Sequence, residues 1–166
     1  MQNLDNRGVT QVTTKAGLTA GTTTTYTTAN AVQYAIDGKA FLKSAVTNGA
    51  TPTTDVNTSA AFNAVGASKG CVFVFGFDDQ GAIKVAQGDI VDLTTEADGA
   101  NASFITELSE FPPLPDNFAA FGYMVTKVGA SGSAWTFGAS NLAGPPSNVL
   151  HTFVDVQTLP KRPQTS

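Results

Sequence analysis

The chain has 166 residues, of which 42% are hydrophobic and only 13% are charged, whereas about 25% of the residues in an average domain are charged. Its formal net charge of -4 at pH 7 argues against nucleic acid as a partner, because binding to phosphates needs clustered lysine and arginine. The single cysteine excludes an intrachain disulfide, and with it the class of small secreted proteins that disulfides hold together.

The beginning of the chain, MQNLDNRGVTQVTT, has neither the basic start nor the apolar core of a signal peptide. No apolar run approaches the roughly 20 residues that a membrane-spanning helix needs. We therefore expect a soluble protein that is not exported by the signal-peptide route and has no membrane partner. Its length suits one domain with a core of its own.

Residues 1–28 are predicted to form an extended N-terminal arm, rich in threonine, which includes most of the stretch LTAGTTTTYTTAN. Consecutive threonines favour an extended backbone, but a run this polar buries too little surface to fix its own register. We expect the arm to become ordered only against a partner. An ordinary disordered terminus is the alternative.

A single β domain is predicted over residues 29–160, because short alternating segments are separated by turns of Gly, Pro, Asn and Ser. The first hairpin lies in AVQYAIDGKAF, where Asp37-Gly38 suits the positive φ angles of a type I′ turn. A long turn-rich connection follows, with one short strand or helical turn; the only suggestion of a helical period in the chain lies around residues 60–67.

The most apolar run, CVFVFGF at residues 71–77, predicts a central strand, because apolar side chains alternate on both of its faces. The next four residues, DDQG, predict a hairpin corner in which Asp78 and Asp79 are exposed, followed by a return strand through Ile83 and Val85. A loose calcium site at this corner is a less favoured alternative, since the loop lacks the ligand spacing of an EF-hand.

Later segments predict the rest of the sheet. A third hairpin is expected between NFAAFGYMVTKV and AWTFGAS, and NVLHTFVDVQTL is expected to close the sheet. The proline-rich stretch EFPPLPDN predicts a rigid connection, because proline cannot donate to a central ladder. Residues 161–166 are expected to form an exposed C-terminal tail. The predicted fold is thus an antiparallel β-sandwich or barrel, jelly-roll-like, with an extended N-terminal arm.

The sequence predicts neither catalysis nor a cofactor. His151 and Cys71 are the only histidine and cysteine, so a usual zinc site cannot be assembled within one chain. No G-x-S-x-G elbow and no glycine-rich phosphate loop is present. We expect His151 to be an ordinary strand residue and Cys71 an inert core thiol. A glycosidase would need two carboxyl groups across an aromatic-lined cleft. Because the chain has only one tryptophan, Trp135, we do not expect glycosidase activity.

Four segments together resemble small virion structural proteins from the heads of tailed bacteriophages and prophages, the capsid decoration or cement proteins. The segments are AVQYAIDGKAF, KGCVFVFGFDDQGAIKVAQG, FPPLPDNFAAFGYMVTKVGASGSAWTFGASNL and TFVDVQTLP, within about residues 30–160. The resemblance implies a non-enzymatic protein, made in the host cytoplasm, that sits on the outer capsid surface of the virion. It implies a homotrimer that clamps neighbouring subunits of the major capsid protein.

The resemblance does not identify the residues that touch the capsid. We expect part of the contact in the arm and part in the basic tail, where a solvated tail is the alternative. Two other functions remain open: a tail or fibre component that contacts a host receptor, and a carbohydrate-binding β-sandwich module or weak hydrolase. The candidate contact residues are Val9, Val12, Thr23, Tyr26, Lys161 and Arg162.

Overall fold

The computed structural model describes residues 8–105 and 110–164. These residues form eleven β-strands and no α-helix, so the predicted all-β class is confirmed. The helical period suggested around residues 60–67 is wrong. This segment consists of turns and isolated bridges, and within it only Phe62 and Val65 are buried. Two buried residues three positions apart imitate one turn of a helix without forming it.

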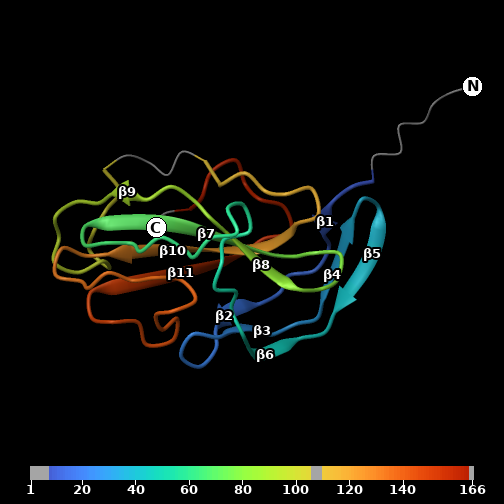
Figure 1. Ribbon diagram of the computed structural model, residues 1–166, viewed down its shortest axis with the longest axis horizontal. Coiled ribbons are helices and arrows are strands. Elements are labelled where there is room, and N and C mark those ends of the chain that lie inside the picture. Colours follow the sequence, from blue (N-terminus) through green and yellow to red (C-terminus); the bar gives the residue numbers. More distant parts are fainter. Residues whose placement is uncertain (1–7, 106–109, 165–166) are drawn as a thin grey trace, which may run out of the picture.

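The strands form three antiparallel sheets (Figure 1). The hairpin sheet has the order β1-β4-β5, with β1 at Gln11–Val12, β4 at Val32–Ile36 and β5 at Lys39–Lys43. The central sheet has the order β11-β10-β7-β8, and β9 also pairs with β7; its strands are β7 (Lys69–Phe77), β8 (Ile83–Gln87), β9 (Val91–Asp92), β10 (Ala119–Val128) and β11 (Val149–Asp155). The third sheet has the order β2-β3-β6, with β2 at Leu18–Ala20, β3 at Tyr26–Thr28 and β6 at Val46–Gly49.

None of these sheets closes into a barrel within the described residues, so the sandwich form of the prediction holds. In Figure 1 the long strands of the central sheet run along the molecule, the third sheet lies below them, and β4 and β5 stand at one end. One hydrophobic core lies between the sheets. All three sheets contribute to it, with Tyr34 from the hairpin sheet, Tyr26 from the third sheet and Phe73, Phe75 and Phe121 from the central sheet.

Strand β7 is buried on both faces, as its sequence predicts. The side chains of Phe73, Phe75 and Phe77 are fully buried in the core between the sheets. Those of Val72 and Val74 are equally buried on the opposite face, under a second cluster that includes Phe118 and Tyr123. Burying one such side chain stabilises a fold by about 1.5–3 kcal/mol. The strand therefore anchors both layers of the protein.

The predicted hairpin after β7 is confirmed, since β7 and β8 pair from Phe77↔Ile83 to Phe73↔Gln87. The expectation that both carboxylates of its corner are exposed is wrong for Asp78, which is 8% exposed. Asp78 Oδ1 accepts hydrogen bonds from the backbone N–H groups of Gln80 (3.0 Å) and Ala82 (2.8 Å). Its carboxylate is buried because it supplies the acceptors that this turn needs.

The prediction of a third hairpin is wrong. Strand β10 pairs with β7 on one side and with β11 on the other, so no edge of β10 is left for the segment around Trp135. That segment instead makes a single bridge from Trp135 to Val65 and inserts the Trp135 and Phe137 side chains into the core. The alternation of apolar residues here predicted correctly that these side chains face inward, but it did not indicate a paired strand.

The described part of the predicted arm, residues 8–28, is not an arm. It contributes β1, β2 and β3, and its apolar residues Val12, Leu18 and Tyr26 are each 3% exposed. Threonine side chains satisfy backbone groups of neighbouring segments; for example, Thr14 Oγ1 donates to the carbonyl of Ala31. The Leu18 N–H donates to Asp155 Oδ1 in β11 at 2.8 Å. A few well-spaced apolar residues thus fix the register, and residues 1–7 lie outside the described structure.

The predicted exposed tail is correct only in part. Lys161 and Arg162 are exposed, but Pro163 is buried and the Gln164 N–H donates to Tyr123 Oη at 3.0 Å. The end of the described chain therefore packs on the outer face of the central sheet, and residues 165–166 lie outside the description. The proline-rich stretch at 111–115 is an irregular connection, as predicted.

Candidate functional site: the free edge of the β4–β5 hairpin

The Asp37-Gly38 hairpin forms as the sequence predicts. Asp37 and Gly38 have φ angles of 50° and 75°, the left-handed region that a type I′ turn requires at both central positions. Strands β4 and β5 pair in register from Ile36↔Lys39 to Val32↔Lys43. The turn therefore sets which side chains of β5 face each side of the sheet.

The inner face of the hairpin is fixed to the central sheet by an aromatic side chain. Tyr34 is 3% exposed, its ring stacks on Phe41 with centroids 5.3 Å apart, and it contacts Phe77 at 5.7 Å. Its hydroxyl donates a hydrogen bond to the carbonyl of Asp78 at 3.0 Å. Burial raises the pKa of Tyr34 most, and the negative charges of Asp78 and Asp79 raise it further. The hydroxyl therefore keeps its proton and remains a hydrogen-bond donor. These contacts attach the hairpin to the central sheet.

Among residues 8–105 and 110–164, no strand lies beside the outer edge of β5. Only β4 pairs with β5 among the described residues. Residues that flank a two-residue turn exchange both of their hydrogen bonds, and bonded and non-bonded pairs then alternate along the ladder. Lys39, Phe41 and Lys43 are therefore bonded to β4, whereas the backbone N–H and C=O groups of Ala40 and Leu42 point outward. We call this strip, residues Lys39–Lys43, the β5 edge.

The side chains of the β5 edge combine one apolar residue with two cations. Leu42 is 67% exposed, the most exposed large hydrophobic side chain of the described residues. Lys39 Nζ lies 5.2 Å from the centre of the Phe41 ring, and Lys43 Nζ lies 5.8 Å from that of Phe77. Neither lysine forms an ion pair with a carboxylate of residues 8–105 or 110–164. The edge is thus a positively charged strip around an exposed leucine.

Two grooves flank the β5 edge, one of about 440 Å³ and one of about 430 Å³. Both are lined by Tyr34, Phe41 and Leu42, so the hairpin forms the wall between them. The first groove runs toward the β7–β8 corner and includes Lys43 and Asp79. The second is more apolar and lies over the other face of the hairpin sheet, where it also contacts Thr13, Gln33, Ala35 and Ala40.

One of the predicted contact residues lies beside this site. Val9 is 59% exposed, and its carbonyl accepts a hydrogen bond from the Gly38 N–H at 3.3 Å. The expectation that Val12 and Tyr26 contact a partner is wrong, because both side chains are 3% exposed and form part of the core. Val12 pairs with Tyr34 in the hairpin sheet, so it supports the site from within.

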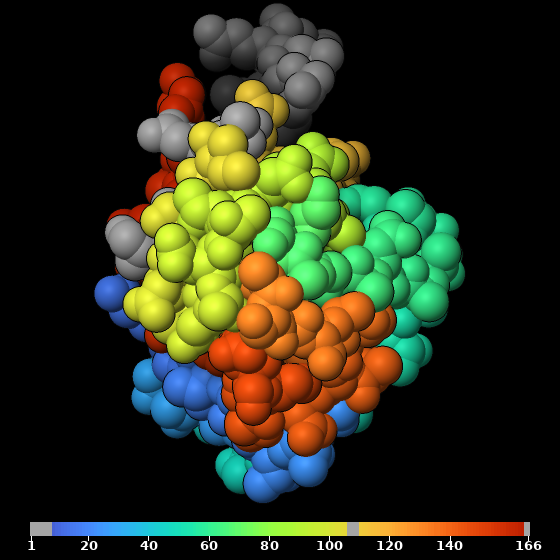
Figure 2. Space-filling view, turned by 90° about the vertical axis from the view of Figure 1, so that its left-hand side faces the viewer, coloured from blue at the N-terminus to red at the C-terminus, as the bar shows by residue number. Residues whose placement is uncertain are grey.

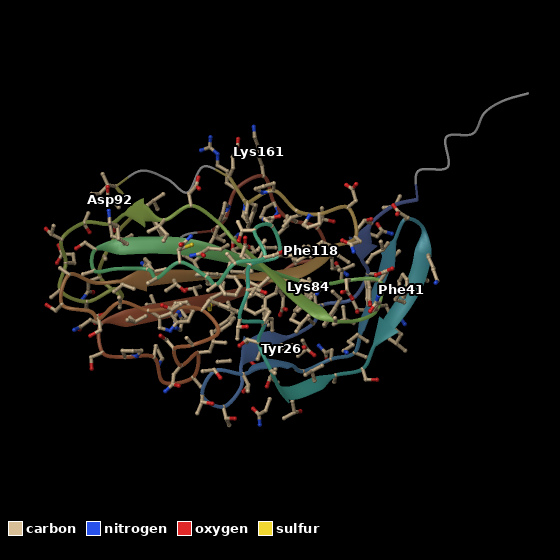
Figure 3. The ribbon with its side chains drawn as sticks, in the orientation of Figure 1. Tyr26, Phe41, Lys84, Asp92, Phe118 and Lys161 are labelled. Atoms are coloured by element: carbon tan, nitrogen blue, oxygen red, sulfur yellow. The ribbon has the colours of Figure 1, made fainter. Side chains whose placement is uncertain are left out.

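The other predicted contact residues lie elsewhere. Thr23 is exposed in the loop between β2 and β3, where its carbonyl accepts hydrogen bonds from Leu142 and Ala143. Lys161 and Arg162 are exposed near the end of the described chain. Figure 3 shows Lys161 on the upper side of the molecule and Phe41 at the end formed by the hairpin. The six residues therefore do not form one surface.

The opposite end of the molecule has a different character. In Figure 2, loops around residues 90–105 and 130–148 cover that end. Their backbone groups bond to one another and to the strand ends; for example, Ala130 N–H donates to Glu96 and Ser131 N–H to Ala97. Other edge strands, such as β11, also have a partner on one side only among the described residues, but the β5 edge is the one that exposes a large hydrophobic side chain.

The buried titratable groups hold structure together. Burial raises the pKa of the Cys71 thiol to about 12 and lowers that of His151 to about 4. Burial also lowers the pKa of Lys127, whose Nζ donates to the carbonyl of Ala102 at 2.8 Å. Trp135 is fully buried, so it cannot serve as a platform for a sugar ring.

Within residues 8–105 and 110–164, no group of three or more His, Cys, Asp and Glu side chains is placed to hold a metal ion. The same residues contain no helix that could span a membrane. Comparisons of the chain with protein-family models, with curated proteins and with solved structures gave no significant match.

The sequence pattern predicted the hairpin, but we did not predict that its edge forms a surface. The signal was present in KAFLK, residues 39–43, because a lysine at each end of a short strand is typical of an edge that must not pair at random. We predicted a contact surface in the threonine-rich stretch instead, because its polarity suggested a segment without a partner in its own chain.

Proposed function

We propose that this protein is a non-enzymatic structural protein of a bacteriophage virion, which binds the outer surface of the assembled capsid and clamps neighbouring subunits of the major capsid protein. The observation that carries the proposal is the β5 edge, which has no second partner strand among residues 8–105 and 110–164 and exposes Leu42 between two lysines that form no ion pair with a carboxylate of those residues. The hairpin AVQYAIDGKAF is also one of the segments that resemble decoration proteins.

The physical basis of such a role is mass action. A protein that binds only the assembled lattice stabilises that lattice, by about 2.7 kcal/mol per site at a free concentration one hundred times the dissociation constant. Small contributions at many copies then oppose dissociation of the capsid. A binding element held rigidly, as Tyr34 holds the hairpin, loses little conformational entropy when it binds.

We also propose that the protein acts as a homotrimer. One β5 edge is only five residues long, so a single copy would bury a small area. Three linked copies convert the second and third contacts into intramolecular events and increase the overall affinity without new contacts. Light scattering on a size-exclusion column tests this part separately.

The test of the proposed function is to mix the purified protein with undecorated, expanded phage heads and to image them by electron microscopy. Regular density on the capsid surface is the expected result. Density only at the tail would favour a receptor-contacting tail component, and no density on any head would overturn the proposal. Saturable binding to soluble glycans by a strict monomer would favour a carbohydrate-binding module instead.

A matched pair of variants shows whether the hairpin carries the binding. Leu42→Asp places a carboxylate in the middle of the β5 edge and is expected to remove the density. Ile105→Asp is the control, because Ile105 is 63% exposed but lies away from the hairpin, beside Asp92. Loss of decoration with both variants, or with neither, would count against the hairpin as the contact surface.

A further inference from the structure

We infer that the β5 edge binds an extended segment of its partner by antiparallel strand addition, and that this segment carries carboxylates opposite Lys39 and Lys43. The inference rests on the proposed function only for the identity of the partner, a capsid subunit. The chemistry of the segment follows from the backbone, the charges and the grooves of the hairpin.

The backbone of the β5 edge presents what an added strand needs. Ala40 and Leu42 point their N–H and C=O groups away from β4, and no hydrogen bond joins these groups to another described residue. An added strand would satisfy them through main-chain hydrogen bonds, which supply affinity, while alternate side chains supply specificity. The hairpin sheet would then grow from three strands by one.

The charges of the β5 edge select the segment. In an added ladder Ala40 and Leu42 occupy the bonded positions, so Lys39, Phe41 and Lys43 occupy the non-bonded positions, where facing side chains approach most closely. Opposite charges that face each other across a strand pair attract, and like charges repel. Because neither lysine has a carboxylate partner in residues 8–105 or 110–164, acidic residues at both facing positions are favoured.

The same charges disfavour a second copy of this chain as the occupant. If two β5 edges paired antiparallel about Phe41, Lys39 of each copy would face Lys43 of the other. Two pairs of like charges would then stand at the closest positions of the ladder. The lysines thus block the pairing of two identical edges, which is a common use of lysine on edge strands, and leave the edge open to an acidic segment.

The groove over the other face of the hairpin sheet sets the remaining positions. Ala40 and Leu42 border it together with Ala35, Thr13 and Gln33. A partner residue opposite Ala40 or Leu42 would point its side chain into this groove, so apolar side chains of moderate size fit there. The expected segment therefore reads acid, apolar, any residue, apolar, acid.

Asp79 opposes this recognition from the other groove. It is exposed and lines the same groove as Lys43, so its carboxylate lies on the side where the first acidic residue of the segment would dock. Removing its charge should tighten binding of an acidic segment. Asp79→Asn thus provides a variant with an expected gain of affinity, which a nonspecific apolar contact would not show.

The test uses a fluorescently labelled peptide, SSEVTVESS, and its counterpart SSKVTVKSS, titrated into the intact protein. The acidic peptide is expected to bind saturably, and the basic one at least about tenfold more weakly, because both facing pairs change from attractive to repulsive. Hydrogen exchange of the Ala40 and Leu42 amides is expected to slow when the acidic peptide binds. Equal binding of both peptides, or no slowing at these amides, would overturn the inference.

Three variants sharpen the test. Ala40→Pro removes an outward N–H without touching the bonds to β4, since proline is tolerated at an edge, and is expected to abolish binding while the thermal unfolding midpoint changes little. The double variant Lys39→Glu/Lys43→Glu is expected to prefer the basic peptide. Lys15→Glu/Lys161→Glu makes the same change of net charge at two exposed lysines away from the edge and is expected to keep the original preference. An unchanged preference in the first double variant would contradict strand recognition.

The outcomes separate this inference from the proposed function. Peptide binding at the β5 edge without decoration of heads would support the binding mode and overturn the phage-head proposal. Decoration of heads that survives Ala40→Pro, together with no peptide binding, would support the phage-head proposal and overturn strand addition.

Discussion

The Tyr34 hydroxyl donates a hydrogen bond to the carbonyl of Asp78 at 3.0 Å and so joins the β4–β5 hairpin to a corner of the central sheet 44 residues away. Tyr34→Phe removes this donor from the Asp78 carbonyl, which keeps its hydrogen bond from the Gly81 N–H, so we expect a loss of about 0.5–1.5 kcal/mol in the free energy of unfolding. Urea denaturation measures the loss. Hydrogen exchange in β4 and β5 is expected to quicken.

The control for this prediction is Tyr26→Phe. Tyr26 is equally buried at 3% exposure, but its hydroxyl makes no hydrogen bond with another described residue. Its replacement is expected to change the free energy of unfolding by less than about 0.5 kcal/mol. Equal losses in the two variants would show that the hydroxyl of Tyr34 is not what fixes the hairpin.

The neighbouring aspartates of the β7–β8 corner are expected to respond differently to removal. Asp78→Ala deletes the acceptor for the Gln80 and Ala82 N–H groups, and we expect a loss of about 2 kcal/mol in stability. Asp79→Ala removes an exposed carboxylate and is expected to cost less than about 0.5 kcal/mol. Thermal unfolding of the two variants side by side decides whether the buried carboxylate holds the turn.

The stability of the fold is expected to depend on His151. Its Nδ1 lies 3.0 Å from Thr126 Oγ1, its ring packs 4.5 Å from Trp135, and its buried Nε2 lacks a hydrogen bond of normal geometry. Burial lowers the pKa of His151 from 6.5 to about 4, and the carbonyl of Asn141 opposes this only in part. The folded state therefore resists protonation that the unfolded chain accepts.

The sign of the pH effect follows from this difference. The contribution of His151 is fully present above pH 6.5, where both states are neutral, and is lost as the pH falls from 6.5 toward 4. Between pH 7 and pH 5 we expect a loss of about 2 kcal/mol. Urea denaturation at several pH values measures it. In His151→Gln the free energy of unfolding should change much less over the same pH range. An unchanged dependence on pH in this variant would show that other groups cause the effect.

Gly76 tests the packing on the outer face of the central sheet, and Gly66, which lies before β7, serves as its control. A Cβ atom at Gly76 would lie 2.4 Å from a ring carbon of Phe118, whereas one at Gly66 would meet no atom within 4 Å. Gly76→Ala is expected to cost about 1–3 kcal/mol, the usual range for overpacking. Gly66→Ala should be close to neutral. Chemical denaturation compares them, and equal stability of the two variants would contradict the close packing of Phe118.

Local patterns in the sequence predicted the parts of the fold that local physics decides. The alternation of Phe73, Phe75 and Phe77 with valines placed β7 at the centre, with both faces buried. The Asp37-Gly38 pair predicted the hairpin of the candidate site, because few residue pairs accept its backbone angles.

Other features depend on contacts between distant segments and could not be predicted in this way. Leu18 and Tyr26 are buried only because other sheets cover them, so a polar composition concealed three strands. The pairing of β10 with β7 and β11 depends on which segments compete for its edges. The free β5 edge of the candidate site is likewise a property of the assembled sheets, since a strand shows its edge only once its neighbours are known.

The hydrogen bond from the Leu18 N–H to Asp155 spans 137 residues, and it bears on how the chain folds during synthesis. A ribosome must release the chain through Asp155 before the third sheet can meet β11. Contacts of such long range make folding slow, on the order of milliseconds to seconds for all-β proteins, and leave unpaired strands exposed for that time. Nascent chains that end before β11 are therefore expected to be sensitive to proteases and to require chaperones.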